Sequence, residues 1–149
     1  MHMVYKVIVV GTDGSERSMV AVNEALGLAK ASGAKLHVVN AVHPAVEVGY
    51  VESKAGQLQI DKVRRGLEAI SAAILAEAKQ HDVPVETHNP GSTDAADALI
   101  SLAEEVDADL VVVGNRGMSG VKRFALGSVP NKVAHHCPCS VLIVNTEAS

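Results

Sequence analysis

The sequence predicts an α/β fold: a single doubly wound domain whose parallel sheet carries helices on both faces. Short, apolar, β-branched runs alternate with amphipathic helical patterns along all 149 residues. That alternation is typical of parallel strands joined by crossover helices. No linker or low-complexity segment divides the chain, so residues 1–149 are expected to form one domain.

Apolar spacing and turn residues place the elements along the chain. The strands are expected at residues 4–10, 35–42, 83–88, 109–113 and 140–145. Ser15 is expected to cap the first helix and Gly33 to end it, because serine accepts hydrogen bonds from first-turn amides and glycine adopts a left-handed conformation. Ser92 or Thr93 is expected to cap the third helix, and Pro84 favours a sheet edge for the third strand.

The last predicted helix runs from about Val129 to His136. Pro130 is tolerated in its first turn, where an N–H has no partner within the helix. The strands are expected to supply the core, chiefly through valine. The expected core residues are Val7, Val9, Val39, Val111, Val113 and Ile143.

The stretch from Val111 to Val129, VVVGNRGMSGVKRFALGSV, carries the strongest functional signal. It leads from a buried strand, through glycines with the spacing Gly-x2-Gly-x9-Gly-Ser, into a helix. Glycines let backbone amides approach a ligand, and a helix N-terminus adds unpaired donors and partial positive charge. The pattern therefore predicts an anion site for a nucleotide phosphate, against the alternative of a loop whose glycines serve only for turning. It matches neither a Walker A motif nor the dinucleotide fingerprint.

Asp13 stands in the turn that follows the first strand, within the sequence GTDGS. A carboxylate there would repel phosphate but would suit a base amino group, a ribose hydroxyl or a metal ion that the ligand carries. The alternative is an aspartate that only stabilises the turn. Ligands of open α/β sheets bind at strand carboxyl ends where the winding direction reverses, so Asp13 and Gly114 would face one crevice if their strands are neighbours.

Composition excludes several classes of function. The net charge of −4 and the small number of aromatic residues argue against binding to nucleic acid. The apolar runs are too short for a membrane span, and the N-terminus lacks the layout of a signal peptide. Two cysteines in the whole chain agree with a reducing compartment. A cytoplasmic protein without a membrane partner is expected.

The cluster HHCPC, from His135 to Cys139, invites a metal interpretation. Its spacing does not match the two separated ligand pairs of structural zinc sites, so the cysteines are expected to pack as small buried residues. The remaining histidines are scattered and give no cluster signal. No metal site is predicted, apart from Mg²⁺ that would arrive with ATP and be held by Asp13.

The chain resembles the universal stress protein family over essentially its whole length. The resemblance rests on VIVVGTDGSERS, on the glycine stretch described above and on CPCSVLIV near the end. The spacing Gly-x2-Gly-x9-Gly-Ser is the signature of the family's ATP-binding branch. The resemblance implies a five-stranded parallel sheet of order 3-2-1-4-5, adenine-nucleotide binding without a well-defined reaction, dimers and a stress-linked regulatory role.

Residues carried over by position give the implied nucleotide site. Asp13 and the backbone near Ala41 would face adenine and ribose, and the purine would lie against aliphatic side chains such as Val10 and Val42. The glycines and the start of the last helix would hold the phosphates. The complete set of predicted nucleotide-binding residues is Gly11, Thr12, Asp13, Ala41, Gly114, Arg116, Gly117, Gly127, Ser128 and Val129.

The sequence departs from the family pattern directly after this set. Pro130 and Asn131 stand where the family usually has a small or hydroxyl residue followed by an acidic one. Proline supplies neither an N–H nor a hydroxyl, so one phosphate donor is missing. AMP and cyclic AMP therefore compete with ATP as the expected ligand.

The main functional hypothesis is a nucleotide-binding regulatory protein, because no nucleophile–base pair is visible and no catalytic residue can be named. One alternative is a slow ATP hydrolase or phosphotransferase in which Asp13 holds Mg²⁺. Another is an interaction module with a vestigial crevice. A homodimer is expected through the apolar edge strand from Ser140 to Asn145, because an uncovered edge invites pairing.

Overall fold

A computed structural model describes residues 4–41, 53–90, 94–115 and 126–147. Strands and helices alternate from one end of the chain to the other, as the sequence predicts. The elements are β1 (Val7–Thr12), α1 (Glu16–Ser32), β2 (Lys35–Asn40), α3 (Lys54–Gln80), β3 (Val85–His88), α4 (Ala95–Glu105), β4 (Leu110–Gly114), α5 (Ser128–His136) and β5 (Ser140–Val144). Within the described part of the chain, no helix is both long enough and apolar enough to cross a membrane.

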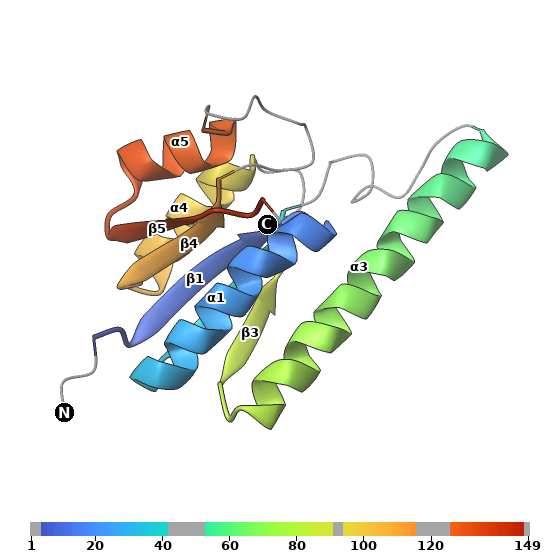
Figure 1. Cartoon of the computed structure of the whole chain (residues 1–149). Coiled ribbons are helices and arrows are strands. Elements are labelled where there is room, and N and C mark those ends of the chain that lie inside the picture. Colours follow the sequence, from blue (N-terminus) through green and yellow to red (C-terminus); the bar gives the residue numbers. More distant parts are fainter. Residues whose placement is uncertain (1–3, 42–52, 91–93, 116–125, 148–149) are drawn as a thin grey trace.

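The five strands form one parallel sheet in the order β3-β2-β1-β4-β5 (Figure 1). This order confirms the topology that the family resemblance implied. β1 lies at the centre, between β2 and β4. β3 and β5 are the edge strands. The edge position of β3 confirms the prediction made from Pro84.

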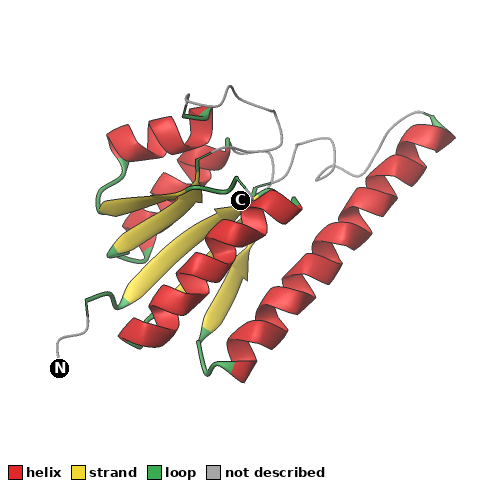
Figure 2. Cartoon of the chain, in the orientation of Figure 1, coloured by secondary structure: helices red, strands yellow, loops and turns green. Residues whose placement is uncertain are grey.

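The helices divide between the two faces of the sheet, and side-chain parity along the strands assigns the faces. Ile8 and Val10 of β1 pack in one buried cluster with α1 and the end of α3. Val9 packs in the other cluster, with α4 and α5. Figure 2 shows helices on both sides of the strands. The winding direction therefore reverses between β1 and β4.

The predicted core is correct at its centre and wrong at its margins. Val9, Val39, Val111 and Val113 are buried. Val7 and Ile143 are only half-buried, because Val7 is the first residue of its strand and Ile143 lies on an edge strand.

Helix ends follow local hydrogen-bonding chemistry. The Ser15 hydroxyl accepts from the Ser18 amide at 3.1 Å, and Gly33 ends α1 with φ 70°, as predicted. The cap predicted for the third helix was wrong. Asp94 is the N-cap of α4, with its carboxylate accepting from the Asp97 amide at 3.2 Å. Ser92 and Thr93 lie outside the described residues.

Candidate functional site

The carboxyl ends of β1 and β4 lie side by side at the point where the winding reverses. The two strands pair in parallel, with Val10 opposite Val112. Continuing this register by two residues brings Thr12 level with Gly114. The strands that precede Asp13 and Gly114 are therefore neighbours, as a shared crevice requires. The β1–α1 turn and the end of β4 lie at one edge of the sheet.

A chain of hydrogen bonds fixes the β1–α1 turn. The Thr12 Oγ1 atom accepts from the Gly14 amide at 3.1 Å and lies 2.6 Å from Ser18 Oγ. The single hydroxyl hydrogen of Ser18 goes to the Ser15 carbonyl at 2.8 Å. Thr12 must therefore donate to Ser18. Because Thr12 is 2% exposed, its hydroxyl serves to shape the turn.

Asp13 is held within this turn by its own side chain. Its Oδ1 atom accepts from the Ser15 amide at 2.9 Å, which is the turn-stabilising role weighed against a ligand role. The residue is half-buried at the carboxyl edge of the sheet. A carboxylate has two oxygens and about four acceptor positions, so this bond is compatible with a second role in holding a ligand hydroxyl or amino group.

Gly11 and Gly14 flank Thr12 and Asp13, and the fold itself explains why each must be glycine. Gly14 has φ +84°, a conformation that favours glycine, and a Cβ there would collide with the side chain of Leu67 in α3. A Cβ on Gly11 would stand 3.2 Å from Leu99 Cδ1 in α4. The absence of a side chain at Gly11 therefore permits α4 to pack closely on the sheet. This role is different from the ligand contact that the sequence predicted for Gly11.

The end of β4 is tied to the start of α5. The Gly127 amide donates to the Asn115 carbonyl at 3.0 Å, which brings the two ends of the glycine-rich stretch together. The Asn115 side chain accepts from the amide and the hydroxyl of Thr146, each at 3.0 Å. Sequence analysis missed Asn115, although a short amide side chain directly after a strand-ending glycine is a signal of such bracing. Arg116 and Gly117 lie outside the described residues.

The start of α5 offers backbone amides at the same edge. Gly127 is its N-cap and provides no side-chain cap. Among the first residues of the helix, Pro130 has no N–H and the Asn131 amide donates to the Gly127 carbonyl at 3.1 Å. By helix geometry, the amides of Ser128 and Val129 are then the donors that lack a partner within the helix. Ser128 is exposed.

Two residues expected to face the base have other roles. The Ala41 amide donates to the Thr12 carbonyl at 2.8 Å, so it extends the β1–β2 pairing. Val10 is fully buried against α1, so the prediction that a purine would lie against it is wrong. The side-chain alternation that directs Val10 toward α1 cannot be read from a run in which every residue is apolar. Val42 lies outside the described residues.

The cysteines are less buried than the sequence predicts. Cys137 and Cys139 are half-buried against the α4–α5 cluster, with their sulfur atoms 3.7 Å apart and without a disulfide. Burial and the neighbouring Cys137 thiol raise the pKa of Cys139 to about 12. Its thiol therefore stays protonated near neutral pH, the form that neither attacks nor binds metal.

The prediction of scattered histidines is wrong for one pair. His37 Nδ1 on β2 lies 2.9 Å from His88 Nε2 on β3, and Glu86 lies beside them. Burial lowers the pKa of His37, with further lowering by His88 and Lys35, while Glu86 and Glu105 act in the opposite direction. The buried imidazole is therefore held in its neutral form.

Comparisons with known proteins agree with this architecture. The profile of the Universal stress protein family matches residues 4–145. The Mycobacterium tuberculosis universal stress protein Rv1636 is 38% identical over 151 residues, which cover 95% of this chain and 97% of the relative. A universal stress protein solved in complex with cAMP is 38% identical, with a TM-score of 0.69 over 96% of this chain and 98% of that one. The Archaeoglobus fulgidus protein solved with dAMP is 24% identical, with a TM-score of 0.63 over 96% and 100% of the two chains, and shows the shared fold alone. The chain belongs to the universal stress protein family.

Proposed function

We propose that the chain binds an adenine nucleotide in the crevice between the Asp13 turn and the start of α5, and that it acts by binding in a stress-linked regulatory role. The observation that carries this proposal is the meeting of β1 and β4 at the reversal of the winding direction. In open α/β sheets this is the edge where ligands bind.

The start of α5 suits a phosphate of low charge. The first-turn amides of Ser128 and Val129, which have no partner within the helix, lie near the positive end of the helix dipole. Because Pro130 contributes no N–H, α5 offers fewer donors than a triphosphate could use. We expect cyclic AMP or AMP to bind at least as tightly as ATP, in keeping with the 38% identical relative that was solved with cAMP.

The Asp13 turn suits the uncharged part of the same ligand. The hydrogen bonds from Thr12 to Ser18 and from the Ser15 amide to Asp13 fix the carboxylate at the end of β1. A fixed acceptor at that place would select ribose hydroxyls or the adenine amino group. It would also disfavour phosphate, which we place at α5.

A direct experiment is to denature freshly purified protein and identify any released nucleotide by mass. Calorimetry with cyclic AMP, AMP, ATP and GTP then ranks the ligands. Ser128→Ala is expected to weaken cyclic AMP binding by about 0.5–3 kcal/mol, the range for a hydrogen bond to a neutral or charged partner. Ser140→Ala is the matched control, because Ser140 is an exposed serine at the opposite, amino edge of the sheet.

Asp13→Asn separates binding from catalysis. Asparagine keeps an oxygen that can accept from the Ser15 amide, so the turn should persist while the charge is lost. The variant is expected to bind cyclic AMP more weakly and to discriminate less against GTP. Hydrolysis of ATP by the parent that disappears in Asp13→Asn would instead favour the slow ATPase. Parental affinity in both Asp13→Asn and Ser128→Ala would exclude this crevice.

A further inference from the structure

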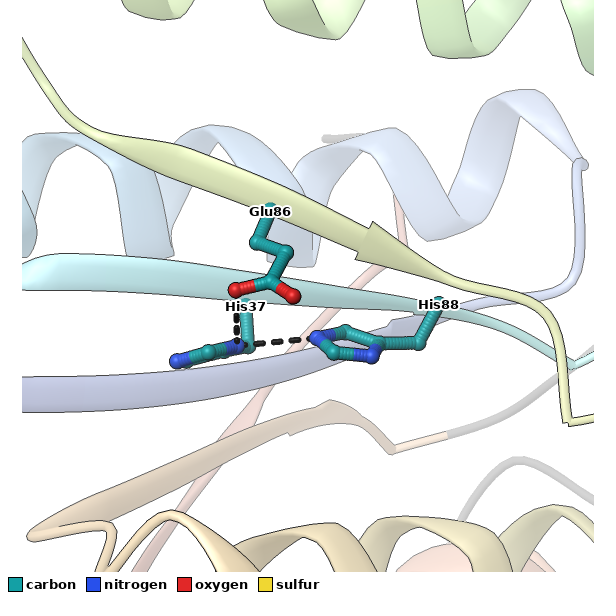
Figure 3. A group of neighbouring side chains, drawn as sticks. All are labelled: His37, Glu86 and His88. Atoms are coloured by element: carbon teal, nitrogen blue, oxygen red, sulfur yellow. Dashed lines mark hydrogen bonds and ion pairs between the residues drawn. The ribbon is translucent and has the colours of Figure 1, made fainter.

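We propose that His37, Glu86 and His88 form a binding site for a divalent transition-metal ion of the zinc class, on the β2–β3 side of the sheet. The three side chains converge from two neighbouring strands (Figure 3). Among the described residues, this is the group of histidine, cysteine and carboxylate side chains whose ligand atoms lie within 4.8 Å of one another. The site is separate from the proposed nucleotide crevice and does not depend on it.

The strand register brings these residues together. His37 lies opposite Glu86 in the β2–β3 pairing, and His88 follows Glu86 by two residues on the same face. This is the face on which α4 packs, because Val39, two residues after His37, belongs to the α4–α5 cluster. The backbone of two paired strands thus fixes the positions of all three side chains.

The donor atoms are close to a metal-binding arrangement. His37 Nδ1 lies 2.9 Å from His88 Nε2 and 3.9 Å from Glu86 Oε2. A tetrahedral ion about 2.1 Å from each donor atom separates two donors by roughly 3.4 Å. The two measured separations bracket this value, so small side-chain rotations would be enough to admit the ion.

The chemistry of the donors also fits. Two imidazoles with one carboxylate form a donor set typical of zinc sites that keep an open position. His37 is 4% exposed, so the packing around its imidazole holds this donor in place. His88 lines a cavity of about 480 Å³ beside α4, through which water can complete the coordination.

Lys35 provides the strongest opposing interaction and hence the sharpest test. Its ammonium group lies 3.0 Å from Glu86 Oε2 and is about half exposed, so it competes with a cation for the same carboxylate. If the cluster binds a metal ion, Lys35→Gln should tighten the binding. If the cluster is only a hydrogen-bonded pair of histidines with a surface ion pair, Lys35→Gln should leave metal affinity unchanged.

The experiment uses the full chain with any affinity tag removed and with metals stripped by chelator. Calorimetric titration with Zn²⁺ is expected to show one ion per chain. Affinity should fall at least tenfold in His88→Gln and in Glu86→Gln, and rise severalfold in Lys35→Gln. His81→Gln is the matched control, since His81 also pairs with a glutamate but lies outside the cluster, and it should bind like the parent.

Circular dichroism and cyclic AMP titration check that the variants keep the fold and the nucleotide crevice. The His88 and Glu86 substitutions lie on an edge strand, so they test the site without opening the core. No zinc binding by the parent would overturn the proposal, as would equal affinity in His88→Gln and His81→Gln. Binding that survives in His88→Gln but is lost in Cys137→Ser would place the ion at the cysteines and overturn it equally.

Discussion

Replacing Thr12 by valine tests whether its hydroxyl builds the turn that carries Asp13. Valine keeps the shape of threonine and replaces the hydroxyl with a methyl group. That hydroxyl accepts from the Gly14 amide at 3.1 Å and donates to Ser18 at 2.6 Å. Thr12→Ser is the matched control, because serine keeps the hydroxyl and loses only a methyl group.

The structure sets the size of the effect. Losing the hydrogen bond to Ser18 costs about 1 kcal/mol, and leaving the Gly14 amide without its acceptor adds about 1–2 kcal/mol in a half-buried turn. Thr12→Val should therefore lower the free energy of unfolding by about 2–3 kcal/mol. Thr12→Ser should lower it by about 1 kcal/mol, the contribution of one buried methyl group.

Urea unfolding followed by far-ultraviolet circular dichroism measures both values, because the chain has no tryptophan to report by fluorescence. Affinity for cyclic AMP should fall in the same order, since the valine variant loosens the turn that carries Asp13. Equal stability of the two variants, or a valine variant more stable than the serine variant, would refute the hydrogen-bond network as a source of stability.

Two further predictions concern packing and assembly. Gly11→Ala should destabilise the fold by about 1–2 kcal/mol, because its new Cβ would stand 3.2 Å from Leu99. Adding Leu99→Val should recover part of this loss. If the effects of the two substitutions on the free energy of unfolding simply add, the contact between the two positions is contradicted. We also propose that β5 pairs with a second copy of this chain. The Val144 carbonyl accepts from the Asn115 amide, so the backbone of Ile143 faces the open edge, and Ile143→Pro should yield folded monomer by light scattering. A parent that is already monomeric, or a proline variant that stays dimeric, would refute edge pairing.

The fold could be predicted because its physical causes are local and repeated. The central strands β1 and β4 are short apolar runs, and parallel strands buried on both faces need no other signal. The errors lie where that argument weakens. Val7 and Ile143 are of the same apolar types as the core residues. Their burial also depends on their position within the strand and on the place of that strand in the sheet, and neither can be read from residue type.

The crevice could be located from sequence more readily than its individual contacts could be assigned. Glycines at the carboxyl ends of β1 and β4 mark this edge of the sheet, but a glycine can be needed for several physical reasons. Gly14 is required by its positive φ, and Gly11 by the approach of Leu99. Likewise the Thr12 hydroxyl and the Ala41 amide form bonds within the fold. Only the geometry separates residues that shape a site from residues placed to contact a ligand.

The histidine–glutamate cluster shows what sequence spacing conceals. Between His37 and Glu86 the chain passes through the whole of α3, so no local motif joins them. Strand pairing removes that distance, and the two-residue period of β3 then places His88 on the same face as Glu86. The signal was therefore present as a histidine on one strand and a Glu-x-His pattern on its neighbour. It becomes readable once the sheet order is known, because β2 and β3 are neighbours and their register sets His37 opposite Glu86.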